Sequence, residues 1–136
     1  MEKELIELMR NQESQLEALL ILLKVQQDMI MKKDTFGLEG LVDKLNECSK
    51  TIAKEEVARR KFLGEYSLVD IINKCNNEEL KHVYEKLRNI LNEIILQKET
   101  NSLLLKQELI FTNKMLNVIN PDREIKTYNS FGGLRK

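Results

Sequence analysis

The sequence predicts an all-α protein: an elongated antiparallel helical bundle of three long helices plus one short helix, with a flexible C-terminal tail. The composition supports this fold class, because the 136 residues include one Pro, five Gly, no Trp and only 5 % aromatic residues, as is typical of long helices. Apolar residues also recur at spacings of three and four, the period of one helix face. We therefore expect one helical domain over residues 1–119 and a flexible tail over 120–136.

The first long helix is expected near residues 2–32. Its apolar seam steps by fours and threes, as in a coiled coil, and has Gln at two of its layers. The seam consists of Leu5, Met9, Gln12, Leu16, Leu19, Leu23, Gln26 and Ile30. The segment Lys33-Asp34-Thr35 then breaks the pattern, and either Asp34 or Thr35 can cap a second helix.

The second long helix is expected near residues 35–63 and ends at Gly64. Because only a few residues join it to the first helix, the two should be antiparallel. Acidic and basic side chains spaced by four near its end predict exposed ion pairs on a solvated face. These residues are Glu55, Glu56, Arg59 and Arg60.

A short helix near residues 68–74 and a third long helix near 77–119 complete the bundle. Ser67 with Asp70 is a variant of the capping box that opens the short helix, and Asn76 with Glu79 resembles the same motif at the start of the long one. No Pro or Gly interrupts the long helix before Pro121 stops it.

The last part of this helix, Asn101 to Ile119, is too apolar for one packed neighbour. Ten of its nineteen residues are Leu, Ile, Phe, Met or Val, and most of them spread over about half of the helix circumference. One neighbouring helix covers a stripe of roughly 100°. A polar stretch, Gln97 to Asn101, separates this segment from the ordinary apolar stripe before it. Either a partner covers the excess surface, or the first two helices or a second copy of the chain do.

Several functions are not expected from this sequence. The 22 basic and 22 acidic residues balance, so no net electrostatic field favours binding to nucleic acid or to anionic lipid. The longest apolar run, Ala18 to Leu23, is too short for membrane insertion, and the acidic, amphipathic opening MEKELIEL does not resemble a signal peptide. Cys48 and Cys75 show no pairing or metal-ligand spacing and are interpreted as reduced thiols of a cytosolic protein.

The sequence also contains no pattern typical of a catalytic site. The single His, His82, is interpreted as a surface residue. No Gly-rich loop joins a strand to a helix, and adjacent carboxylates such as Glu55 and Glu56 point apart on a helix. We therefore expect no enzyme activity, no catalytic residue, no bound metal and no cofactor. The tail, in contrast, carries the apolar side chains Ile125, Tyr128, Phe131 and Leu134, as docking peptides do.

Taken in order, these segments resemble the FlgN family, cytoplasmic chaperones of the flagellar type III export system for the hook-filament junction (hook-associated) proteins. The resemblance covers essentially the whole chain. It includes LEALLILLKVQQDMIMKKD followed by Leu38 and Leu41, and KEEVARRKFL at the end of the second helix. It also includes Asn101 to Leu105, then Leu109, Phe111 and Met115-Leu116, and a loose tail with a Tyr and a Gly.

The resemblance implies a cytoplasmic protein that binds an amphipathic helix of a junction protein and delivers it to the export gate. The implied client-binding residues are Leu104, Leu105, Leu109, Phe111, Met115, Leu116 and Ile119. Tyr128 is the implied residue for binding the cytoplasmic part of the gate, although Tyr128 and Phe131 could instead fold back as a lid over the apolar helix. The free protein would be a monomer or a weak homodimer. The alternative is a structural coiled coil or homodimeric spacer without a client.

Overall fold

The computed structural model describes residues 2–119, 127–128 and 134–135. Four helices follow in order, α1 (Glu2–Met31), α2 (Thr35–Leu63), α3 (Leu68–Lys74) and α4 (Glu78–Ile119). Two strands of two residues, β1 (Thr127–Tyr128) and β2 (Leu134–Arg135), pair antiparallel, and no sequence pattern predicted them. The all-α fold class is confirmed, and the expected helix bounds agree to within one residue. The predicted flexible tail falls largely on residues 120–126 and 129–133, which lie outside the described part of the chain.

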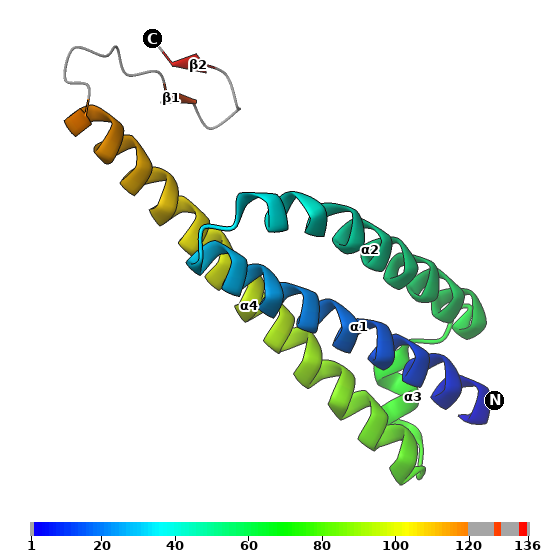
Figure 1. Cartoon of the computed structure of the whole chain (residues 1–136). Coiled ribbons are helices and arrows are strands. Elements are labelled where there is room, and N and C mark those ends of the chain that lie inside the picture. The colour runs from blue at the N-terminus through cyan, green and yellow to red at the C-terminus, as the bar shows by residue number, and fades with distance from the viewer. Residues whose placement is uncertain (1, 120–126, 129–133, 136) are drawn as a thin grey trace.

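The helix α1 lies between α2 and α4 and packs on both (Figure 1). Gln12 contacts Glu56, and Cys48 contacts the carbonyl of Gln15, so α2 runs antiparallel to α1, as expected. Glu13 of α1 contacts Lys86 of α4, and closer to the C-terminal ends of both helices Gln27 contacts Gln97. α4 therefore runs parallel to α1. The contacts between α2 and α4 themselves are marginal.

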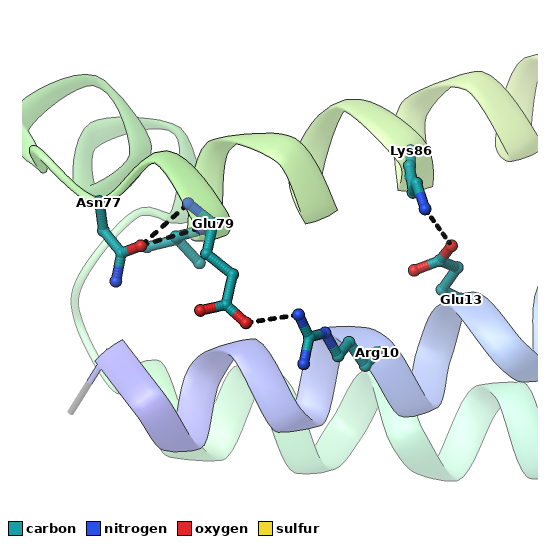
Figure 2. Close-up of polar contacts among 6 residues, drawn as sticks. Arg10, Glu13, Asn77, Glu79 and Lys86 are labelled. Atoms are coloured by element: carbon teal, nitrogen blue, oxygen red, sulfur yellow. Dashed lines mark hydrogen bonds and ion pairs between the residues drawn. The ribbon is translucent and has the colours of Figure 1, made fainter.

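The α1–α4 pair forms most of the hydrophobic core. The seam predicted for α1 meets a matching seam on α4, with apolar residues again spaced by three and four. Leu5, Met9 and Leu80 are fully buried, and Val83, Leu87 and Ile94 continue the core along α4. Ion pairs flank this seam: Arg10 with Glu79, and Lys86 with Glu13 at 3.9 Å (Figure 2). Apart from Glu13, these side chains are about half exposed, so each pair contributes only a few tenths of a kcal/mol.

Both ends of α2 are capped as the sequence predicts. The Asp34 carboxylate accepts a hydrogen bond of 2.9 Å from the Gly37 N–H, which caps α2. Gly64 ends α2 with a φ of +61°, a conformation that Gly adopts without steric strain.

Two predicted caps were wrong in detail. Ser67 occupies the N-cap position of α3, but its side chain makes no capping hydrogen bond. The cap of α4 is Asn77 instead of Asn76, because the Asn77 side-chain oxygen accepts from the backbone N–H groups of Glu79 at 3.0 Å and Leu80 at 3.2 Å (Figure 2). Neighbouring Asn residues offer the same chemistry, and the path of the preceding chain decides which one reaches the helix end.

The helix α2 packs more loosely than α1 and α4. Only Leu41 and Leu63 are buried among its 29 residues. The predicted pair of Glu56 with Arg60 is present at 2.9 Å, but the prediction of a solvated face was wrong for Glu56 and Arg59, whose side chains are only 33 % and 16 % exposed. Both line a cavity between the helices, because this side of α2 faces α1 and α4. Burial alone would raise the pKa of Glu56. The hydrogen bond and charge of Arg59, together with hydrogen bonds from Arg60 and Gln12, outweigh burial, so the pKa of Glu56 is lowered.

Candidate protein-binding surface

The C-terminal half of α4 extends beyond the helix on which α4 packs. α4 has 42 residues and α1 has 30, which correspond to about 63 Å and about 45 Å. Because the two helices start side by side and run parallel, the orange end of α4 projects past the turn between α1 and α2 (Figure 1). At that turn, Lys33 contacts α4 through an ion pair of 3.9 Å with Glu108 and lies 4.6 Å from the ring centre of Phe111.

The projecting segment is apolar and exposed. Val118 and Ile119, at 74 % and 73 %, are the most exposed apolar residues in it. The other exposed apolar side chains of residues 105–119 are Leu105, Leu109, Ile110, Phe111, Met115 and Leu116. An apolar surface of this extent is unusual on a protein that acts alone, and it marks this end of α4 as a candidate interaction site.

Six of the seven predicted client-binding residues are exposed, and Leu104 is half-buried. By helical spacing, they lie on both sides of the strip of α4 that faces α1. Leu105 and Leu109 share a cavity with Leu38 of α2, and Leu116 continues their row by helical spacing. Leu104, Phe111 and Met115 form the opposite side. Val118, which was not predicted as a site residue, extends that second side, and its position in the apolar arc could have identified it.

A polar layer fixes where this surface begins. Asn101 is only 2 % exposed and donates hydrogen bonds to the Leu23 carbonyl at 2.7 Å and to Gln26 Oε1 at 2.9 Å. Gln97 donates to Asn101 Oδ1 at 3.0 Å and to Gln27 Oε1 at 2.7 Å. The helix is continuous through Gln97 to Asn101, as predicted. The sequence did not show that this polar stretch also bonds to α1, through the side chains of Gln97 and Asn101. A buried amide paired with another amide sets the register between two helices.

Replacing Asn101 with Ala should lower the free energy of unfolding by about 1–3 kcal/mol, because buried polar partners on α1 and α4 would lose their hydrogen bonds. Urea denaturation followed by circular dichroism measures the change. The exposed Asn92 on the same helix is the matched control, since Asn92→Ala should be neutral or slightly stabilising. Equal effects of the two substitutions would show that the polar layer contributes no stability.

The remaining candidate residues do not form a chemical site. His82 is exposed, and Cys48 and Cys75 are both free. Burial, together with the nearby Glu55, raises the pKa of the Cys48 thiol, so this cysteine is a poor nucleophile. In the described part of the chain, no group of His, Cys, Asp or Glu residues could hold a metal ion. No helix among the described residues is long and apolar enough to cross a membrane.

Comparison with known families decides the class of protein. The FlgN protein family matches residues 1–136, the entire length of the chain. The chain belongs to the FlgN family. No curated protein and no solved structure matches it. FlgN membership indicates a flagellar export chaperone, a function that depends on binding proteins, and the exposed apolar end of α4 offers a surface for such binding.

The backbone of Tyr128, the predicted gate-binding residue, forms part of β1. Its pairing partner in β2 is Leu134. The tail residues Ile125 and Phe131, which were predicted as further anchors, lie outside the described residues. The role of Tyr128 therefore remains a prediction based on the family resemblance.

Proposed function

We propose that this FlgN-family protein is a cytoplasmic chaperone of the flagellar type III export system, and that it binds hook-filament junction proteins and delivers them to the export gate. The observation that supports this most directly is the exposed apolar end of α4, which projects beyond its neighbour α1. Family membership supports the general class, and the surface supports the way in which a client would bind.

The client would bind as an amphipathic helix. An apolar helix face recognises a partner helix through large side chains at helical spacing, which lose water when the two helices meet. Leu104, Leu105, Leu109, Phe111, Met115, Leu116 and Ile119 supply such side chains over about four turns. Complete burial of one such side chain contributes about 1.5–3 kcal/mol. Because part of each side chain is already covered and binding also orders the client, only a fraction of this sum would appear as affinity.

Isothermal titration calorimetry with a purified hook-filament junction protein tests the proposal. We expect one-to-one binding with a negative heat-capacity change, the signature of apolar surface burial. A structural coiled coil or homodimeric spacer would instead bury the α4 surface against a second copy. Light scattering coupled to gel filtration separates the two possibilities, since the chaperone should change from a monomer or weak homodimer to a heterodimer when client is added. A stable homodimer that ignores the junction protein would contradict the chaperone function.

The tail would act as a second, separate docking element. We assign binding of the cytoplasmic part of the export gate to Tyr128, because a phenol can bury a large ring and still offer its hydroxyl to one polar partner. Pro121 separates this segment from α4 in the sequence. Docking through a short segment should be weak, as suits a step in which the client is handed over.

Replacing Tyr128 with Ala should weaken gate binding by about tenfold, the loss expected for part of one aromatic anchor, and leave client affinity within about threefold. Biolayer interferometry with the purified cytoplasmic gate domain and with the junction protein measures both affinities. Tyr128→Phe is the control for the hydroxyl, since it retains the ring. A rise in client affinity on Tyr128→Ala would show instead that the tail acts as a lid over α4.

A further inference from the structure

A cleft lies on α1 between α2 and α4. Two neighbouring cavities make it up, one of about 350 Å³ and one of about 290 Å³, and we call them together the α2–α4 cleft. The first is lined by Leu19 and Gln26 of α1, Leu45 and Ser49 of α2, and Ile94, Asn101 and Leu105 of α4. The second is lined by Leu38 of α2, by Leu105 and Leu109 of α4, by Ile30 of α1 and by Lys33 of the turn after α1. Each exceeds the roughly 150 Å³ that accommodates a benzene-sized group, so each can take large side chains.

The cleft is open because the bundle lacks a helix on this side. α2 and α4 both pack on α1, but their contacts with each other are marginal. As a result, the apolar residues Leu38 and Leu45 on α2 are only half-buried, as is Leu19 on the floor of the cleft. In a four-helix bundle a further helix would cover such side chains.

The cleft continues directly into the exposed apolar end of α4. Leu105 lines both cavities, and Leu109 lines the second. Leu116 lies seven residues, or two helical turns, beyond Leu109 on the same side of α4. From Ile94 to Leu116, this row of α4 is about 33 Å long. A single helix of about twenty residues could therefore contact the cleft and the projecting end together.

We propose that the client helix enters the α2–α4 cleft, where Leu38 and Leu45 of α2 contact it as a second wall opposite α4. This inference rests on the proposed function, because it names further residues for binding the same client. The occupant is an amphipathic helix whose apolar face packs on Leu19, Leu105 and Leu109, and whose polar face stays in water. The complex is then a four-helix arrangement instead of a two-helix contact.

A second copy of the chain fits this cleft poorly. In a two-fold symmetric dimer the same surface of both subunits meets, so the surface has to be self-complementary. Two concave clefts cannot fill each other, whereas a single convex helix fills one. A dimer could fill both clefts only by inserting the projecting end of each α4 into the partner's cleft, and that end would then be lost to the client. The polar groups on the floor also favour an apolar client face, since Asn101 and Gln26 are hydrogen-bonded to each other and need no outside partner.

Replacing Leu45 with Glu tests the α2 wall. We expect client affinity to fall by at least about tenfold, because a carboxylate would be desolvated against the apolar client face. Val57→Glu is the matched control: Val57 is an exposed apolar residue on the same helix, lines neither cavity, and should leave affinity within about threefold. Calorimetry with the junction protein measures affinity, and thermal unfolding followed by circular dichroism measures stability.

Photo-crosslinking gives a second readout that does not place a charge in the cleft. A benzophenone amino acid at Ser49, an exposed residue that lines the first cavity, should crosslink to the client. The same group at Lys54, which helical spacing places on the opposite side of α2, should not. Equal crosslinking from both positions, or none from Ser49, would overturn the inference.

The outcomes also separate this inference from the function on which it rests. If Leu45→Glu binds client like the parent while Leu105→Asp with Leu109→Asp abolishes binding, the client does not contact the α2 wall and the inference is wrong, but the chaperone function stands. If Leu45→Glu instead raises client affinity, a segment of this chain occupies the cleft, and the inference is wrong. If the parent protein binds no junction protein, the proposed function itself fails.

Discussion

Replacing both Leu105 and Leu109 with Asp should weaken client binding by at least about 100-fold. The two side chains are 43 % and 64 % exposed in the free protein, so both can still lose water when a client helix packs on them. Losing about 1.5 kcal/mol at each position corresponds to about two orders of magnitude in the dissociation constant. Desolvation of the two new carboxylates would increase the loss. Calorimetry with a purified junction protein measures it.

The helix itself should survive this change, because neither residue belongs to the hydrophobic core. Far-ultraviolet circular dichroism should therefore give nearly the parent spectrum. Leu96→Asp is the control, since Leu96 is also exposed on α4 but lies outside the candidate surface. It should leave the affinity within about threefold. A double variant that bound like the parent would place the client-binding site elsewhere on the molecule.

Replacing Leu80 with Ala should lower the free energy of unfolding by about 2–5 kcal/mol. Leu80 is fully buried near the start of α4, and it belongs to the same core cluster as Leu5, Met9 and Ile72. The substitution would leave a cavity where α1, α3 and α4 come together. A loss of about 3 kcal/mol lowers the melting temperature of a domain of this size by about 10 °C.

Differential scanning calorimetry measures this shift, and Leu96→Ala is the control for the loss of a leucine side chain on the same helix. Because Leu96 is exposed, its replacement should change the melting temperature by no more than about 2 °C. Client affinity at 20 °C should remain near that of the parent for both variants, since the client surface lies at the far end of α4. Similar shifts for Leu80 and Leu96 would contradict the assignment of the core.

The candidate surface could be located from the sequence, but its shape could not. Helical spacing identifies Leu105, Leu109 and Met115 as members of an apolar arc too wide for one neighbour. It does not show that Leu105 and Leu109 face a cleft shared with α2, or that Phe111 lies against Lys33 of the turn after α1. That distinction depends on where α2 and the turn after α1 lie in space.

The features that could be predicted without the structure were local: the helix bounds, the caps at Asp34 and Gly64, and the apolar excess near the end of α4. These features follow from hydrogen bonds and side-chain spacing within a few residues of the chain. Two features became visible only in the folded molecule: α4 runs parallel to α1, and Asn101, at the end of the polar stretch, is buried. The reason is that Asn101 finds its partner Gln26 75 residues away, and the period of one helix carries no information about the residue that faces it across the core.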